Sequence, residues 1–129
     1  MSYWLWLVGV LTPSIALVLN ARALSFSSYL QLCESFSLSF RRVKDCNDDD
    51  WNYEFAELLN LIENACHIYR SRIIWGSTRG MLRDYLTGII DGINRDDKMR
   101  RAAAAAITGD RTFGEITKFA AKNGIKFLE

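Results

Sequence analysis

The first 21 residues of this 129-residue chain contain no charged side chain, and the whole sequence contains one histidine and one proline. A single proline and an apolar fraction of 50% exclude a collagen-like, low-complexity or disordered chain. Three cysteines are an odd number without paired spacing, so they do not form a disulfide framework. The net charge of +1 lacks the basic surplus of typical nucleic-acid-binding proteins, and we do not expect a nucleic-acid partner.

The sequence also lacks the local motifs of common catalytic and metal sites. It contains no P-loop, dinucleotide-binding fingerprint, nucleophile elbow or zinc pattern. The acidic run at residues 45–50 lacks the glycine and the terminal glutamate of a calcium-binding loop, and helix capping explains it more simply. We therefore expect no cofactor and no metal, and the usual reason to propose an enzyme is missing.

The uncharged N-terminal segment has the features of a membrane anchor. At about 1.5 Å per residue, a helix over residues 3–21 is roughly 28 Å long, which matches the apolar thickness of a bilayer. Trp4 and Trp6 lie near one end, Arg22 closes the other, and a membrane helix tolerates Pro13. A signal peptide has a basic region before its apolar stretch, and no basic residue precedes this segment. The alternative is a helix buried in a soluble core.

The charges around this segment predict its orientation. Arg22, Arg41, Arg42 and Lys44 all follow it, and the positive-inside rule therefore places the C-terminal part in the cytoplasm. Unpaired cysteines fit a reducing compartment. We predict a single-pass protein of the inner (plasma) membrane, in contact with membrane lipid, with residues 1–22 as the transmembrane anchor.

Residues 23–44 are predicted to form a juxtamembrane helix or linker. Helical spacing gives this segment one apolar stripe, made of Phe26, Tyr29, Leu30, Cys33, Phe36 and Phe40. Serines alternate with apolar residues from 35 to 40, so a strand is the alternative to the helix that we prefer. Residues 41–50, where the charge changes from basic to acidic, are expected to be a linker. This apolar stripe must be covered by the soluble domain, by the membrane interface or by a second copy of the protein.

Residues 45–129 are predicted to form a small cytoplasmic domain of antiparallel helices, so the expected fold class is all-α. Its first helix starts in the acidic run, buries a stripe between Trp51 and Ile73, and stops at Gly76. A second helix starts at Ser77 or Thr78. A domain of this size is marginally stable alone, so packing against residues 23–40 or self-association would help.

Turn and capping residues predict the other helix ends. Asn94 is expected to end the second helix, and Asp96 or Asp97 to cap a third one that stops at Gly109. A capping-box spacing over residues 112–115 predicts the start of a last helix, which ends at Gly124.

Four polar residues on one side of the first bundle helix form a candidate site: Asn60, Glu63, Asn64 and His67. A Glu-x-x-x-His pair can act as a base and its orienting group, or as two metal ligands. Two ligands are too few for a metal site, and a surface or packing role for His67 is the simpler interpretation. Cys66 falls on the apolar face, which favours a buried, unreactive thiol.

The charges of the domain are unevenly distributed along the sequence. Residues 45–69 carry seven negative charges and no positive charge, whereas residues 70–101 carry eight positive and four negative charges. The candidate basic surface comprises Arg70, Arg72, Arg79, Arg83, Arg100 and Arg101. Such a surface can bind phosphate groups, contact anionic lipid or pair with a second copy. A solvated surface with internal ion pairs is the simpler alternative.

A short anchor, a polar hinge and the helical sequence NYEFAELLNLIENACHIY together resemble small single-pass bacterial membrane proteins of unknown function with a cytoplasmic helical domain. Residues 51–72 carry most of the resemblance. It implies a bacterial source, and some proteins of this general plan are suspected of roles in phage defence or stress response. No catalytic residue carries over from it.

Three functions remain open at this point. The first is a membrane-tethered interaction or regulatory module that binds a protein partner or another copy of itself. The second is an oligomerising membrane-active effector that perturbs the bilayer. The third is an enzyme that uses Glu63 and His67.

Overall fold

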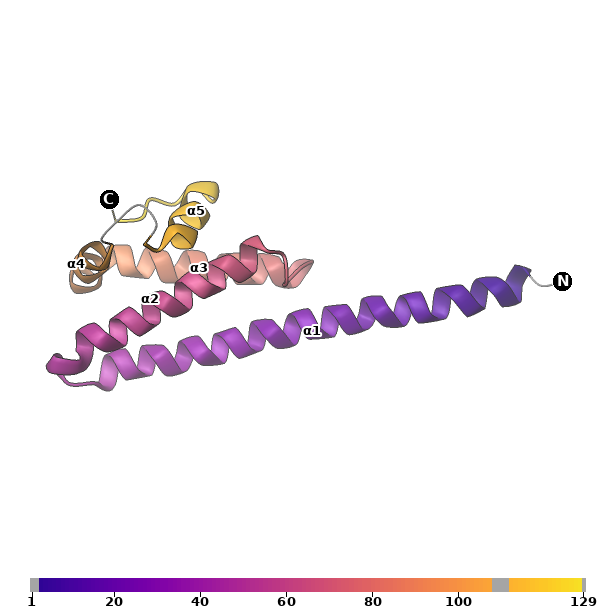
Figure 1. Cartoon of the computed structure of the whole chain (residues 1–129), viewed down its shortest axis with the longest axis horizontal. Helices are drawn as coiled ribbons and strands as arrows, with labels where there is room; N and C mark the ends of the chain where they lie inside the picture. Colours follow the sequence, from indigo (N-terminus) through magenta and orange to yellow (C-terminus); the bar gives the residue numbers. More distant parts are fainter. Residues whose placement is uncertain (1–2, 108–111, 129) are drawn as a thin grey trace.

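The computed structural model describes residues 3–107 and 112–128, and within these ranges the chain forms five helices and no strand (Figure 1). The helices are α1 (Tyr3–Asp45), α2 (Asp48–Arg70), α3 (Ser77–Arg95), α4 (Asp97–Ala106) and α5 (Gly114–Lys122). The all-helical fold predicted from the sequence is confirmed.

α1 is one continuous helix of 43 residues, which corresponds to a length of about 64 Å. The preferred helix over residues 23–40 is therefore confirmed, and the alternative strand is wrong. The expected linker over residues 41–50 is also wrong, because only Cys46 and Asn47 separate α1 from α2. The last turn of α1 remains helical because Val43 is buried in the core, and Lys44 places a positive charge near the helix C-terminus.

The buried face of α1 begins at Ser25. The next residues of α1 that are buried or packed against the core are Tyr29, Leu32, Phe36, Phe40 and Val43, so five intervals cover eighteen residues. This average of 3.6 residues per interval is the helical period, so these residues share one face. The stripe expected from the sequence was partly wrong, since Phe26 and Leu30 remain 45% and 50% exposed. The other helices cover the face that is buried.

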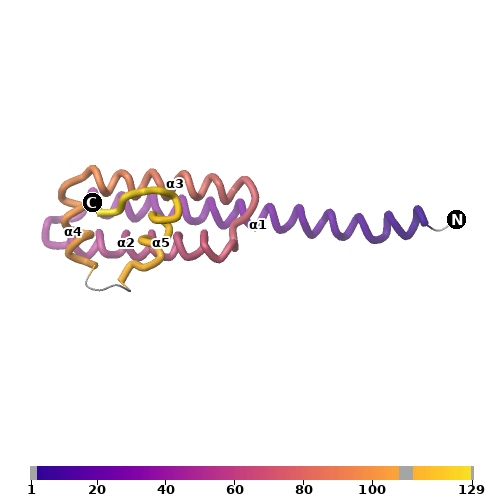
Figure 2. Tube along the Cα trace, turned by 90° about the horizontal axis from the view of Figure 1, so that it is seen from above, coloured from indigo at the N-terminus to yellow at the C-terminus, as the bar shows by residue number. Residues whose placement is uncertain are grey.

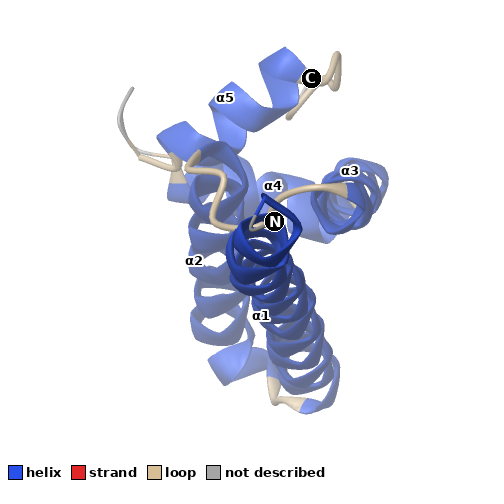
Figure 3. Cartoon of the chain, turned by 90° about the vertical axis from the view of Figure 1, so that its right-hand side faces the viewer, coloured by secondary structure: helices blue, strands red, loops and turns tan. Residues whose placement is uncertain are grey.

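α1 from Ser25 onward and the four shorter helices form one unit, called here the bundle. α2 runs antiparallel to α1 and α3 runs back again, and both pack against α1 (Figure 2). α4 and α5 lie on the side of α2 and α3 that faces away from α1 (Figure 3). The N-terminal half of α1 extends beyond the bundle without any neighbouring helix (Figures 1 and 2).

The core of the bundle combines residues from all five helices. Its largest fully buried side chains include Phe36, Phe55, Leu58, Ile62, Leu86, Ile90 and Ile116. The predicted stripe of α2 is confirmed from Phe55 to Tyr69. Ile73 is instead 60% exposed, because α2 ends at Arg70 and not at Gly76.

Two of the predicted helix ends are confirmed in detail. The Asp96 carboxylate accepts a hydrogen bond from the backbone N–H of Met99 at 3.0 Å and so caps α4. At the end of α5, Gly124 has a φ of +67°, and the N–H of Ile125 donates to the carbonyl of Ala120 at 2.9 Å. This is a Schellman motif, which requires a left-handed residue that glycine adopts without strain.

The predicted capping box over residues 112–115 is wrong. α5 begins at Gly114, and the preceding Phe113 has a left-handed backbone with no side-chain cap. The expected stop at Gly109 lies outside the described residues, and α4 ends at Ala106. Asn94, expected to end a helix, also has a tertiary role, since its side chain donates to the Lys126 carbonyl.

Candidate functional site

Glu63 on α2 holds the N-terminus of α5. Its two carboxylate oxygens accept hydrogen bonds from the backbone N–H groups of Glu115 and Ile116, both at 2.8 Å. α5 has no cap from its own sequence, so a carboxylate from another helix satisfies the N–H groups that a helix start leaves unpaired. Glu63 therefore acts as a structural cap of α5.

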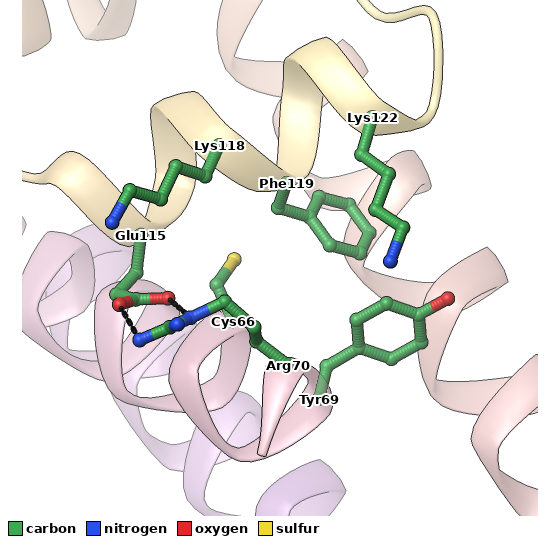
Figure 4. Close-up of a pocket in the computed structure, with 7 residues that line it drawn as sticks. All are labelled: Cys66, Tyr69, Arg70, Glu115, Lys118, Phe119 and Lys122. Atoms are coloured by element: carbon green, nitrogen blue, oxygen red, sulfur yellow. Dashed lines mark hydrogen bonds and ion pairs between the residues drawn. The ribbon is translucent and has the colours of Figure 1, made fainter. Parts of the chain in front are cut away.

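A second contact ties the same two helices together through Glu115. Arg70 donates from Nε and Nη2 to the two carboxylate oxygens of Glu115, both at 2.7 Å (Figure 4). His67 Nδ1 lies 3.6 Å from Glu115 Oε1. The hydrogen bonds and positive charge of Arg70 lower the pKa of the Glu115 carboxyl below its usual value. The cluster therefore joins α2 to α5 by charge-assisted hydrogen bonds.

Sequence reasoning considered Glu115 only as a capping-box residue. One signal was present, because Glu115 is the single acidic residue between positions 112 and 128, among three lysines. Its partners lie 45 and 48 positions earlier in the chain, at Arg70 and His67. Only the tertiary packing of α5 on α2 brings them together.

A small pocket of about 80 Å³ lies beside this cluster, between α2 and α5. It is lined by Cys66, Tyr69, Arg70, Glu115, Lys118, Phe119 and Lys122 (Figure 4). Burial raises the pKa of the Cys66 thiol to about 12, so the thiol is neutral at physiological pH. No three His, Cys, Asp or Glu side chains in the described parts of the chain are grouped to hold a metal ion.

The structure brings together only part of the predicted polar cluster. Glu63 and His67 both approach Glu115, whereas Asn60 and Asn64 are exposed on α2. The His67 side chain is itself 57% exposed. These contacts are those of a helix-docking site, which is consistent with the packing role considered for His67.

The six residues of the candidate basic surface are divided between the two ends of the bundle. Arg70, Arg72 and Arg79 surround the α2–α3 loop, at the end that faces the N-terminal half of α1 (Figure 1). Arg100 and Arg101 belong to α4, at the opposite end (Figure 1). The structure therefore presents two separate groups of cations, with Arg83 on the second turn of α3 nearer the first group.

Most of these cations have partners within the bundle. Arg83 lies 3.4 Å from a carboxylate oxygen of Asp84, and Arg100 lies 2.6 Å from one of Asp97. The guanidinium of Arg79 lies 3.8 Å from the centre of the Tyr69 ring.

The buried Ser25 of α1 binds the α2–α3 loop through two hydrogen bonds. The Ser25 hydroxyl accepts a hydrogen bond from the Trp75 N–H at 3.1 Å and donates to the Trp75 carbonyl at 3.4 Å. Arg22, one turn earlier on α1, places its guanidinium carbon 5.9 Å from the Trp75 ring. The loop is thus held where the uncharged segment of α1 ends.

The uncharged half of α1 is exposed along its whole length. Trp4 and Trp6 are 81% and 67% exposed, and Pro13 lies inside the continuous helix. The hydroxyls of Thr12 and Ser14 donate to carbonyls one turn earlier, at 2.8 and 2.9 Å. Within the described residues, α1 is the one helix long and apolar enough to cross a membrane, by length and composition.

A wider groove of about 580 Å³ runs between α1, α3 and α4. Its floor includes Gly88 and Gly92 of α3, next to Tyr85, Ile89 and Ile93. A Cβ atom added at either glycine would meet no atom within 4 Å. These glycines therefore leave open space on the bundle surface and do not serve a close helix contact within the described chain.

Comparisons of this chain with protein-family models, with curated proteins and with solved structures give no match.

Proposed function

We propose that this chain is a single-pass membrane protein whose residues 3–21 cross the bilayer, with the bundle held at the membrane surface. The observation that carries the proposal is the exposure of the uncharged half of α1, whose most apolar 18-residue window has no buried residue. Leaving apolar area in water costs about 25 cal/mol per Å². The apolar layer of a bilayer would cover this apolar surface, because its thickness matches the length of the segment.

Two hydroxyl groups in the exposed segment support the same proposal. A hydroxyl without a hydrogen-bond partner is costly in lipid. Thr12 and Ser14 avoid this cost because each bonds to a carbonyl of its own helix.

Alkaline carbonate extraction of membranes tests the anchor. The full chain should remain in the membrane pellet, and a variant lacking residues 3–21 should move to the soluble fraction. Intact-mass measurement of the extracted protein should show that the first 21 residues are retained. Their removal would indicate a cleaved signal sequence, and a full-length chain in the carbonate supernatant would contradict the anchor.

We place the bundle on the cytoplasmic side of the inner (plasma) membrane. Arg22 follows the uncharged segment directly, and the bundle end nearest to it carries Arg70, Arg72 and Arg79. The positive-inside rule favours the cytoplasm for such a flank. A C-terminal fusion to green fluorescent protein should fluoresce, whereas a fusion to alkaline phosphatase should be inactive. The reverse pair of results would invert the orientation.

At the membrane, we propose that the bundle is an interaction module for a protein partner or a second copy of the chain. The open groove at Gly88 and Gly92 supports this, because the half-buried apolar side chains of Tyr85 on α3 and Met99 on α4 line it. Tethering raises the local concentration of partners, so that a modest surface suffices.

Photo-crosslinking in membranes tests this interaction. A crosslinker at position 88 should give one discrete product, and a crosslinker at the exposed Thr117 on α5 serves as the control. A product of twice the chain mass identifies a second copy, and another mass identifies a different partner. Equal background labelling at both positions would contradict an interaction through the groove.

The alternative of a bilayer-perturbing effector rests on the Trp-rich uncharged anchor and on the serine-lined apolar stripe that follows it. In the structure the bundle covers that face of α1 at Phe36 and Val43. Overexpression with unchanged membrane potential would agree with the interaction module, whereas a collapse of the potential would favour the effector.

A further inference from the structure

We infer that the bundle end nearest the uncharged half of α1 docks on anionic phospholipid headgroups. The docking surface, called here the basal surface, is formed by Arg22 and Phe26 of α1 and by Arg72 and Trp75 of the α2–α3 loop. The inference rests on the proposed membrane anchor, and it names the lipid class that the bundle contacts.

The position of the basal surface is fixed by the anchor. If residues 3–21 fill the apolar layer, Arg22 lies at the headgroup level. Ser25 is about 4.5 Å further along the helix axis, and its two hydrogen bonds hold Trp75 at that depth. The loop therefore meets the headgroup layer without any change in the fold.

The charge of this surface is complementary to an anionic membrane. Every charged residue between Glu63 and Asp84 is cationic or is the histidine. Among the described residues, Arg22 and Arg72 have no carboxylate partner in an ion pair, in contrast to Arg70, which Glu115 neutralises. Two arginines without a protein counter-charge are thus available at the depth where lipid phosphates lie.

The apolar residues of the basal surface fit a membrane interface better than water. Phe26 is 45% exposed, although it lies beside a well-packed core. Trp75 borders a groove of about 490 Å³ that Arg22 and Phe26 also line. Tryptophan and arginine side by side are typical of the headgroup layer, where an amphipathic ring and a cation are both solvated.

A second copy of the chain is a poorer occupant of this surface. Two basal surfaces facing each other would bring arginines of like charge together, which is unfavourable. The anchor also orients the basal surface toward the lipid in every copy. We therefore commit to the anionic bilayer as the partner.

Hydrogen–deuterium exchange of the full chain in lipid nanodiscs tests the inference and the anchor separately. The nanodiscs contain phosphatidylcholine with increasing fractions of phosphatidylglycerol. Amides of residues 4–19 should be protected in every composition, which reports the anchor. Amides of residues 71–78 should gain protection only as the phosphatidylglycerol fraction rises, and 1 M NaCl should remove this gain because it shortens the Debye length to about 3 Å.

Substitutions at Arg72 identify the electrostatic contribution. Its backbone φ is +60°, a conformation that asparagine tolerates. R72N should therefore keep the loop fold and require a roughly fivefold higher phosphatidylglycerol fraction for half-maximal protection, the effect expected for one cation near an anionic surface. R72K should retain the protection. R101N, an equal change of charge at an exposed position of α4, at the end of the bundle opposite the N-terminal half of α1, is the matched control and should have no effect (Figure 1).

Equal exchange of residues 71–78 in both lipids, or equal effects of R72N and R101N, would overturn the docking inference while the anchor stands. Unprotected amides at residues 4–19 would instead overturn the anchor.

Discussion

The two halves of α1 are the same helix in opposite surroundings. Residues 3–20 are uncharged, mostly apolar on every side, and touch no other helix. Residues 25–43 are apolar along one face, and the other helices cover that face. Both halves satisfy their backbone hydrogen bonds internally. They differ in where the apolar area lies around the helix axis.

This comparison shows that the two halves of one helix differ in how polar residues are distributed around it, and this distribution predicts what covers each half. A stripe can be covered by neighbouring helices, whereas a fully apolar cylinder needs cover from every direction. The five predictions below test the difference, from the largest expected effect to the smallest.

Two phenylalanines of α1, ten residues apart, measure how completely the bundle covers its C-terminal half. Phe36 is fully buried, and Phe26 is 45% exposed. F36A should lower the free energy of unfolding of the bundle by about 3–5 kcal/mol, because it leaves a cavity. F26A should lower it by less than about 1 kcal/mol, because that side chain is only partly covered. Urea titration of the full chain in detergent, followed by circular dichroism, provides the measurement, and equal losses would contradict the packing.

Two leucines of α1 test whether its N-terminal half spans a membrane. Leu11 lies in the middle of the uncharged segment, and Leu24 lies just beyond Arg22. L11R should oppose membrane insertion by about 2.5–3.5 kcal/mol, the cost of arginine at the centre of a membrane helix. L24R should insert normally, because its charge lies in the headgroup layer. The carbonate-resistant fraction of each variant is the readout, and unimpaired insertion of L11R would contradict a spanning segment.

Removal of the Glu63 cap should lower the stability of the bundle and leave membrane insertion of α1 unchanged. E63Q replaces one acceptor oxygen by an amide group that cannot accept a backbone N–H, and removes the charge at the α5 N-terminus. We expect a loss of about 1–3 kcal/mol in unfolding free energy. E57Q, at an exposed position of the same helix, should change it by less than about 0.5 kcal/mol. Similar values for the two variants would show that the cap contributes little.

Acid should weaken the docking of α5 on α2. Because Arg70 lowers the folded-state pKa of Glu115, its contribution is present above the usual value of 4.5 and is lost as the pH falls through the lowered pKa. Urea titrations between pH 7 and pH 3 should show this loss, and E115Q should reduce the slope while membrane retention stays constant. An unchanged slope in E115Q would assign the pH dependence to other carboxylates.

Cysteine labelling tests the packing of α5 on α2 without any substitution. Cys66 is 1% exposed, and its pKa of about 12 leaves roughly a thousandfold less thiolate than the ordinary value of 9.0. Maleimide at pH 8 should modify the half-buried Cys33 and Cys46 and leave Cys66 unmodified, as mass spectrometry of labelled fragments can show. Labelling of Cys66 at the rate of Cys46 would indicate that α5 opens frequently.

The sequence allowed most helices to be predicted, because their signals are local. Periodicity identified α2 and α3, and capping chemistry identified Asp96 and Gly124. The linker after residue 40 was wrong because charge reversal was interpreted as a break. Arg42 and Lys44 instead lie in the last turn of α1, and the acidic run begins α2.

The site was less predictable, because its contacts are distant in sequence. Glu63 was identified as a notable residue, but its partners at the start of α5 are 52 and 53 positions away. Similarly, nothing local to Ser25 indicates that its hydroxyl holds Trp75, 50 positions later. Such contacts depend on the angles at which helices pack, which periodicity does not specify.

The unbroken course of α1 also has a mechanical consequence. If residues 3–21 span a bilayer as proposed, α1 continues without a break from the lipid into the bundle and tilts as one rigid element. A tilt of about 10° where α1 leaves the lipid would swing the far end, about 35 Å away, sideways by about 6 Å. Thinning or thickening of the membrane would thus be transmitted directly to the position of the groove.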